Sequence, residues 1–80
     1  MDATRLTGAA FAQRVGVDYT TASRLRNGNR LPSLRLFARI VREFGLDSDF
    51  ALAAFEKGPE VFGAFLRRYV FESREFANAA

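Results

Sequence analysis

The sequence contains no histidine and no cysteine among its 80 residues. Without cysteine the chain has no disulfide. A domain of this length has a thin core, so its stability must come from tight helix packing, from oligomerisation or from both. A catalytic site would have to use carboxylates, tyrosine or lysine, and no acid pair stands in a recognisable catalytic context. Metal-ligand spacings and phosphate-binding glycine loops are missing too. The sequence therefore predicts no enzyme, no metal site and no cofactor.

Long apolar runs are also missing. No stretch approaches the ~20 apolar residues of a membrane span, and the N-terminus lacks the apolar run of a signal peptide. The composition is 49% hydrophobic with nine phenylalanines, which is enough to fold and argues against disorder. We therefore expect a soluble intracellular protein with no membrane partner and no small-molecule substrate.

The positive charge is concentrated in the first half of the chain. Residues 1–42 hold eight arginines and two acids, a net charge of +6, whereas residues 43–80 hold four cations and seven acids, a net charge of −3. Eleven of the twelve cations are arginine, whose planar guanidinium makes forked contacts with phosphate or guanine. The basic half is therefore expected to meet a polyanion, while the acidic half faces elsewhere.

Turn-forming residues divide the chain into short segments. Sustained alternation of apolar and polar residues is absent, so strands are not expected, whereas apolar residues recur at helical spacing between the turns. Residues suited to the N-cap or N1 position open these segments, and glycine closes most of them. The sequence therefore predicts an all-α, compact bundle of about five short helices in one domain over residues 1–80. The expected helices cover residues 7–15, 18–27, 33–44, 47–57 and 59–73.

Helical periodicity also predicts the buried faces. Phe71 is expected on a different side of the last helix from its apolar arc. With Phe76 it exceeds what one small core needs, which favours a dimer or partner surface, or packing of the tail. Gly63 in the same helix costs about 1 kcal/mol against alanine unless a neighbouring helix approaches closely. The residues expected in the core are Phe11, Ala12, Val15, Ala22, Leu25, Leu34, Phe37, Ala38, Val41, Phe44, Phe50, Ala54, Phe55, Phe62, Phe65, Leu66, Tyr69 and Val70.

Two short helices joined by Gly16-Val17 form a candidate helix-turn-helix over residues 7–28. The major groove of DNA admits one α-helix, and the second helix of this motif presents its outer residues to base edges. At 100° per residue, Thr20, Ser23, Arg24 and Asn27 lie opposite the expected buried side. Hydroxyl, amide and guanidinium groups can read bases, although a solvated helix face can carry them as well.

Residues 7–47 resemble the Cro/phage-repressor helix-turn-helix family (XRE-type, lambda-repressor-like). That family has a polar cap, a small apolar pair, Gly-Val, a recognition helix ending in Asn-Gly, a basic residue, Pro-Ser and a long apolar helix. The joint spacing of these features covers about half of the chain. In this sequence they are Thr7, Phe11-Ala12, Gly16-Val17, Asn27-Gly28, Arg30, Pro32-Ser33 and Leu34–Phe44.

The resemblance implies roles for individual positions. Gly8 replaces a residue that is often a long polar contact maker in the family, so a contact from that side chain is lost. Candidate phosphate ligands combine the positions that the family uses with further arginines of the basic half. The candidate base-reading residues are Tyr19, Thr20, Thr21, Ser23 and Arg24, and the candidate phosphate ligands are Arg14, Arg26, Asn27, Arg30 and Arg35.

Several of these side chains have a second interpretation. Arg24 is expected to read a base rather than to contact phosphate or solvent, because a forked contact of arginine with guanine is the commonest specific contact. Tyr19 either stacks on a sugar or thymine methyl group or only covers the turn. Arg26 points to the side of its helix, which favours phosphate or solvent. Arg39 and Arg42 are interpreted as part of a solvated face.

The N-terminus departs from the family pattern. A full helix normally precedes the motif, and here only residues 1–6 precede Thr7. Either this segment extends the first helix backward or the missing packing comes from elsewhere, with the phenylalanine-rich last helix as the candidate. That helix also carries the candidate dimer interface, which consists of Phe62, Phe65, Tyr69 and Phe71.

The resemblance implies a sequence-specific, double-stranded DNA-binding transcriptional regulator of the phage or prophage Cro or repressor type. Such a protein occupies an operator through the major groove in the cytoplasm of a bacterial host cell. In a homodimer, half-sites about 34–36 Å apart are expected. The alternative is a protein-interaction module, such as an antitoxin or antirepressor, that acts through the phenylalanine-rich C-terminal half.

Overall fold

The computed structural model describes residues 6–73, which form five α-helices and one π-helical turn. Strands are absent from this described part, so the all-α prediction is confirmed. No helix within residues 6–73 is long and apolar enough to cross a membrane. The elements in chain order are α1 (Gly8–Val15), α2 (Tyr19–Arg26), α3 (Leu34–Phe44), α4 (Ser48–Glu56), α5 (Pro59–Leu66) and η1 (Arg67–Phe71).

Local sequence signals explain where these helices begin and end. Four N-cap side chains each accept a hydrogen bond from the backbone N–H three residues ahead, at 2.9–3.4 Å. Gly16 and Gly45 end α1 and α3 in the left-handed conformation, with φ of 77° and 60°. Pro59 opens α5 at the first helical position. The four capping residues are Thr7, Asp18, Ser33 and Asp47.

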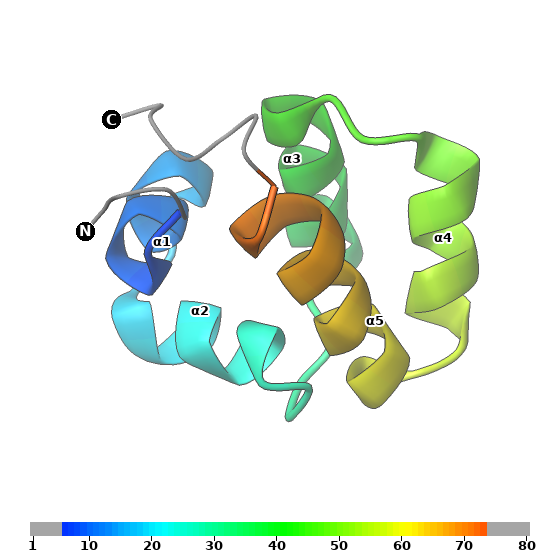
Figure 1. Cartoon of the computed structure of the whole chain (residues 1–80), viewed down its shortest axis with the longest axis horizontal. Coiled ribbons are helices and arrows are strands. Elements are labelled where there is room, and N and C mark those ends of the chain that lie inside the picture. Colours follow the sequence, from blue (N-terminus) through cyan, green and yellow to red (C-terminus); the bar gives the residue numbers. More distant parts are fainter. Residues whose placement is uncertain (1–5, 74–80) are drawn as a thin grey trace.

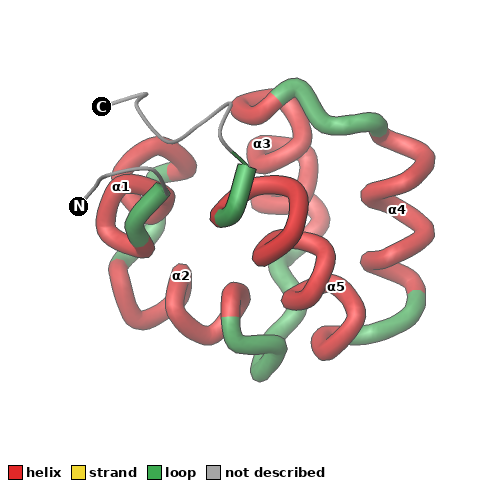
Figure 2. The backbone as a smooth tube through the Cα atoms, viewed as in Figure 1, coloured by secondary structure: helices red, strands yellow, loops and turns green. Residues whose placement is uncertain are grey.

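The two helices of the motif lie at one end of the molecule (Figure 1). α1 and α2 pack on each other there, α4 lies at the opposite end of the long axis, and α3 and α5 lie between them. The molecule measures 35 × 24 × 19 Å along its principal axes. Short loops join the helices, as Figure 2 shows. α5 packs on both α2 and α4, so it connects the two ends of the bundle.

Phenylalanine rings form a continuous core through the bundle. Phe11 stacks on Phe44 with ring centroids 5.6 Å apart, and Phe62 lies 5.9 Å from Phe37 and 5.7 Å from Phe65. These contacts join α1 to α3 and α3 to α5. The largest fully buried side chains are Phe11, Val15, Leu25, Ile40, Phe62, Leu66 and Val70.

The predicted core stripe of α3 is wrong in part. Leu34 is 69% exposed and Ala38 is also exposed, whereas Ile40, which we did not predict to be buried, is fully buried. The apolar residues of this helix define two overlapping stripes at helical spacing. The neighbouring helices select one of them, because α1 covers Phe44 and α5 covers Phe37.

Three further core predictions on α4 and α5–η1 are also wrong. Phe50 is 51% exposed and Tyr69 is 39% exposed, and Phe71, expected on a different side of the helix, is buried. A π-helical turn explains the position of Phe71. The N–H of Glu72 donates to the carbonyl of Arg67 at 2.9 Å, five residues back. The wider turn holds more residues than an α-helical turn, so Phe71 rotates back toward the core.

α5 and η1 pack on the helices of the motif. The ring of Phe71 lies 4.9 Å from that of Phe11 on α1. Thr7 has an extended backbone, with φ −83° and ψ 160°, so α1 does not continue backward through it. The end of the last helix thus packs on α1, the contact that we expected it to supply. Residues 1–5 and Phe76 lie outside the described residues.

The predicted dimer surface needs correction. Phe62, Phe65 and Phe71 have exposed fractions of 0–7% within one chain. Their rings pack against other rings of the same core, so they offer little area to a second copy of the folded chain. Only Tyr69 of the four predicted residues is exposed.

Candidate nucleic-acid interface

A tight turn sets the angle between α1 and α2. The backbone N–H groups of Gly16 and Val17 both donate to the carbonyl oxygen of Ala12, at 2.9 and 3.0 Å. Gly16 has a positive φ that residues with a Cβ rarely adopt. Ala22 and Leu25 are fully buried, so one face of α2 is seated on the core and the opposite face meets solvent.

The outer face of α2 carries three of the five predicted base-reading side chains. Tyr19, Thr20 and Arg24 are exposed, and Tyr19, at 55%, is the most exposed aromatic residue within residues 6–73. Thr21 and Ser23 are half-buried. The structure thus brings Tyr19, Thr20 and Arg24 together as an accessible face, while Thr21 and Ser23 contribute less surface to it.

Asp18 fixes the first turn of α2. Its carboxylate accepts a hydrogen bond from the backbone N–H of Thr21 at 3.4 Å. A side-chain hydrogen bond from Thr21 makes the largest contribution to lowering the pKa of Asp18 below its ordinary value of 3.8. Backbone hydrogen bonds and the charge of Arg24 act in the same direction. The Asp18 carboxylate is therefore ionised at neutral pH, and its negative charge interacts favourably with the positive end of the helix dipole.

Gly8 explains the position of Tyr19. A Cβ built on Gly8 would lie 2.9 Å from the Cε1 atom of the Tyr19 ring and 3.1 Å from Nη1 of Arg26. The ring therefore packs directly on the first residue of α1, and a larger residue at position 8 would push it away. This contact joins the starts of α1 and α2, and no local sequence signal predicts it.

The predicted phosphate ligands differ in accessibility. Asn27, Arg30 and Arg35 are exposed around the outer face of α2 and at the start of α3. The Asn27 amide also donates to the hydroxyl of Ser23 at 3.4 Å. Arg26 is half-buried, and its guanidinium carbon lies 5.5 Å from the centroid of the Phe71 ring. Arg26 therefore has part of its side chain committed to packing.

The Arg14 side chain makes contacts within the fold. Its Nε lies 3.1 Å from a carboxylate oxygen of Glu43, and its guanidinium carbon lies 4.6 Å from the centroid of the Phe44 ring. The ion pair compensates its charge and joins α1 to the end of α3. Arg14 is therefore removed from the candidate phosphate ligands, because its cation already has a partner.

Arg39 is placed beside the turn of the motif. A Cβ built on Gly16 would lie 3.3 Å from the guanidinium carbon of Arg39, so this side chain lies across the turn. Arg35 and Arg39 both line a shallow groove of about 170 Å³, together with Ser33, the cap of α3. The i, i+4 spacing places Arg35 and Arg39 on one face of α3. The contact of Arg39 with Gly16 shows in addition that this face lies beside the turn of the motif.

A family model described as helix-turn-helix matches residues 4–50, which is more than half of the chain. The chain belongs to the XRE-type helix-turn-helix family. As a member, it is a DNA-binding transcription regulator, from a family that is not enzymatic. The resemblance to Cro and repressor proteins seen in the sequence is thereby confirmed at the level of the family.

The residues that match the family model include the whole helix-turn-helix motif of this XRE-type regulator. Residues 4–50 include α1, the turn, α2 and α3, and they end at the start of α4. α5 and η1 lie outside the matched range. No curated protein and no solved structure matches the chain significantly, so the assignment rests on the family model and on the helical architecture.

Proposed function

We propose that this XRE-type regulator recognises a specific double-stranded DNA operator through the major groove, with α2 as its reading helix. The observation that carries the proposal is the exposed face formed by Tyr19, Thr20 and Arg24 on a helix whose other face is buried. Arg30 and Arg35 are exposed beside it and supply cation for the DNA backbone. The dimensions of an α-helix suit the major groove.

Each side chain has a distinct chemical task in this proposal. Arg24 makes a forked contact with the O6 and N7 atoms of a guanine, while Tyr19 and Thr20 contact neighbouring base edges or a thymine methyl group. Asn27, Arg35 and Arg39 bind phosphates, which positions the helix without reading sequence. The protein would act as a single domain in a bacterial host cell. It would occupy an operator of phage or prophage type and block polymerase.

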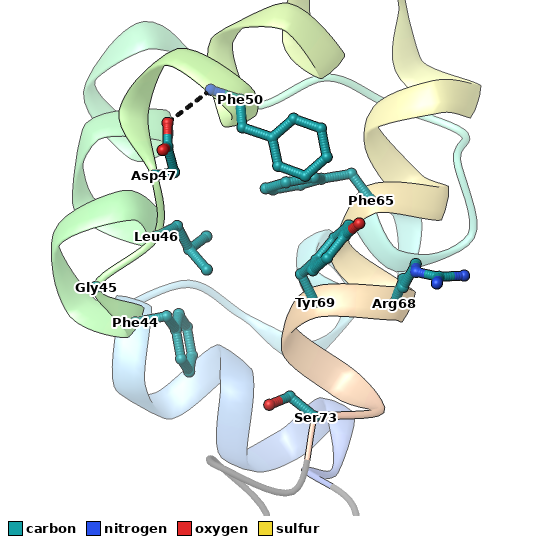
Figure 3. A pocket seen from close by; sticks show the side chains of 9 residues that line it. All are labelled: Phe44, Gly45, Leu46, Asp47, Phe50, Phe65, Arg68, Tyr69 and Ser73. Carbon is teal, nitrogen blue, oxygen red and sulfur yellow. Dashed lines mark hydrogen bonds between the residues drawn. The ribbon is translucent and has the colours of Figure 1, made fainter.

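A homodimer is the second part of the proposal, with an interface different from the one expected from the sequence. A groove of about 340 Å³ lies between α4 and the α5–η1 segment, where Phe50, Phe65 and Tyr69 face one another (Figure 3). Their ring centroids are 5.2–5.6 Å apart. Arg68 and Asp47 line the same groove, so the surface carries both signs of charge, which a two-fold interface can pair between the two copies.

The same groove favours one alternative function. Exposed aromatic side chains can also bind a different protein, and the regulator would then act as an antitoxin or antirepressor through its C-terminal half. The two functions differ in their response to salt. Association with DNA releases counterions and weakens steeply as salt rises, whereas association through an apolar groove does not.

Selection of bound duplexes from a random DNA pool tests the proposal. We expect enrichment of one sequence, and a log–log plot of its affinity against salt whose slope reflects the number of phosphates contacted. Enrichment of a two-fold symmetric sequence would support the dimer as well. Salt-insensitive association with a protein, together with no enriched DNA sequence, would favour the alternative and contradict operator binding.

A further inference from the structure

The end of the recognition helix rests on a segment outside the family match. Arg26 is the last residue of α2, and its carbonyl oxygen accepts a hydrogen bond from Nη1 of Arg67 in η1. The two residues are 41 positions apart in the chain, and the bond is partly buried. The last carbonyl groups of a helix have no hydrogen-bond partner within the helix. A cation at this end also interacts favourably with the negative end of the helix dipole.

A second contact holds the same end of α2. A Cβ built on Gly63 of α5 would lie 2.6 Å from the Cα of Gly28 and 3.1 Å from the carbonyl oxygen of Leu25. The backbone of α5 therefore touches the backbone of the turn that ends α2. The Phe71 ring next to the guanidinium of Arg26 adds a third contact from the same segment. α5 and η1 thus hold the C-terminal end of the reading helix through three contacts.

We infer that Arg67 is a positioning residue for DNA recognition, which holds α2 at the orientation that its outer face needs to read bases. The inference rests on the proposed function of α2. Because α2 has only eight residues, the direction of its side chains depends on how both ends are held. Asp18 and the contact between Tyr19 and Gly8 hold the first end. Arg67 is the charged group that holds the second.

Among the proposed base-reading residues, Arg24 should be affected most by loss of the Arg67 hydrogen bond. It lies in the last turn of α2, two residues before the carbonyl that Arg67 binds. Base contacts require geometry held to a fraction of an ångström, whereas phosphate contacts tolerate small shifts. Loss of the Arg67 bond should therefore reduce discrimination between sequences more than it reduces affinity for DNA in general.

The test compares Arg67→Met with Arg42→Met. Both changes remove one positive charge and keep an apolar stem, but Arg42 is exposed on α3 and lies outside the contacts that hold α2. Affinities for the selected operator and for a random duplex are measured at one salt concentration, at a temperature where circular dichroism shows each variant folded. We expect Arg67→Met to lower operator affinity about tenfold more than Arg42→Met does. The two variants should bind random DNA within about twofold of each other. Arg67→Lys, which can still donate to the carbonyl, should recover part of the preference.

Other results would overturn the inference. Arg67→Met could weaken binding to operator and to random DNA equally, and could lower the slope of affinity against salt by about one more than Arg42→Met does. Arg67 would then be a phosphate ligand instead. If the melting temperature falls but the ratio of operator to random affinity is unchanged, its role is only structural. A wild-type protein that prefers no DNA sequence would overturn the proposed function itself, and the wild-type measurement shows this before any variant is compared.

A readout without DNA keeps the inference testable in the protein alone. The backbone N–H groups of Asn27 and Asn29 donate to the carbonyls of Ser23 and Arg24, at 2.9 Å in both cases. In Arg67→Met these two amides should exchange with solvent at least several-fold faster, while amides in α1 keep their wild-type rates. Unchanged exchange at the end of α2 would overturn the inference. If the methionine variant does not fold, Arg67→Lys replaces it, with a smaller change of the same sign expected.

Discussion

Individual arginines in the basic half have different tasks because of where their guanidinium groups lie. Arg14 is paired with Glu43 and packed on Phe44. Arg24 is exposed on the outer face of α2, and Arg35 is exposed in the first turn of α3. Arginine thus joins helices at Arg14, and we propose that it reads bases at Arg24 and binds phosphate at Arg35. Separate substitutions of Arg24 and Arg35 can therefore divide specificity from general affinity.

Replacement of Arg24 and of Arg35 by alanine should weaken DNA binding in different ways. Arg24→Ala should cost about 1–3 kcal/mol on the operator and relax the preference at one base pair, because a forked contact with a base is lost. Arg35→Ala should weaken operator and random DNA alike and lower the salt slope by about one. Titration of both duplexes at several salt concentrations measures these effects. Equal losses on the two duplexes for Arg24→Ala would contradict its assignment as a base reader.

The Asp18 carboxylate should make the stability of the protein depend on pH at the acidic end. Its pKa is lowered in the folded state, first by the side-chain hydrogen bond from Thr21. A group whose pKa falls on folding stabilises the folded state above its unfolded value, near 3.8, and this stabilisation is lost as pH falls through the lower folded value. Asp18→Asn keeps an oxygen acceptor for the cap but does not titrate.

Thermal unfolding of the wild type and of Asp18→Asn between about pH 6 and pH 2 checks this prediction. The wild type should lose stability relative to the variant as pH falls below about 4. All other carboxyl groups titrate in both proteins, so their contributions cancel in the difference. A difference in melting temperature that stays constant over the whole range would contradict the role of Asp18.

At the scale of helices, local signals predicted boundaries well and faces less well. Thr7, Asp18, Ser33 and Asp47 act as caps at the predicted positions, because a cap is a contact between residues three positions apart. The buried face depends on which other helices arrive. Ile40 is buried and Leu34, which had been expected in the core, is exposed. The reason is that α1 and α5 cover a neighbouring stripe of α3.

The candidate site follows the same rule. The exposure of Thr20, Arg24 and Asn27 could be predicted from the period of one helix, whereas Tyr19 came from the family resemblance. Ser23, expected on the same face, is half-buried. The partner of Arg14 lies 29 residues away, and the hydrogen bond from Arg67 to the end of α2 spans 41 residues. Such contacts leave no periodic signal in the sequence. The π-helical turn that buries Phe71 has no side-chain cap, and no local signal in the sequence predicted it.

The close approach of α5 to α2 makes a prediction about Gly63. In an ordinary helix interior, replacement of glycine by alanine stabilises by about 1 kcal/mol. Here the added methyl group would lie 2.6 Å from the Cα of Gly28, which belongs to the backbone and cannot move aside cheaply. Gly63→Ala should therefore destabilise the protein by about 1–3 kcal/mol.

Urea unfolding of Gly63→Ala, with Ala64→Gly as the matched change at the next position, measures this effect. Ala64 is exposed in the single chain, so at a protein concentration where the chain is monomeric its replacement reports helix propensity, a loss of about 1 kcal/mol. If propensity also governed position 63, Gly63→Ala would raise the free energy of unfolding. That outcome would contradict the backbone contact between α5 and the end of α2.

At the scale of the whole molecule, the reading helix and the apolar groove lie in different parts of the bundle. α2 is at one end of the long axis, and α4, which forms one wall of the groove, is at the other (Figure 1). Exposed apolar side chains gather on α4 and on the α5–η1 segment, where Phe50, Val61 and Tyr69 are 39–51% exposed. This separation lets the protein associate through the groove while α2 remains open to DNA.

The dimer predicted at this groove can be tested by placing a charge in it. Val61 lines a second pocket that adjoins the groove and shares Phe50, Phe65, Arg68 and Tyr69 with it. Val61 is 42% exposed, so Val61→Glu should leave the fold intact. Burial of the added carboxylate at the interface costs desolvation free energy, which Lys57 and Arg68 of the same pocket offset only in part. The dissociation constant of the dimer should therefore rise at least about tenfold, as measured by sedimentation equilibrium. Leu52→Glu is the matched control, because Leu52 is 40% exposed on α4 but does not line the groove.

The operator provides a second measurement of the same dimer. A dimer binds two half-sites about 34–36 Å apart with higher affinity than one half-site, since the second contact follows the first within one complex. Val61→Glu should remove this advantage and leave affinity for a single half-site unchanged, because α2 is not altered. Leu52→Glu should retain it. If wild type and Val61→Glu sediment alike and bind both operators alike, the groove does not join two copies of this regulator. Its exposed aromatic side chains would then fit the alternative of a different protein partner.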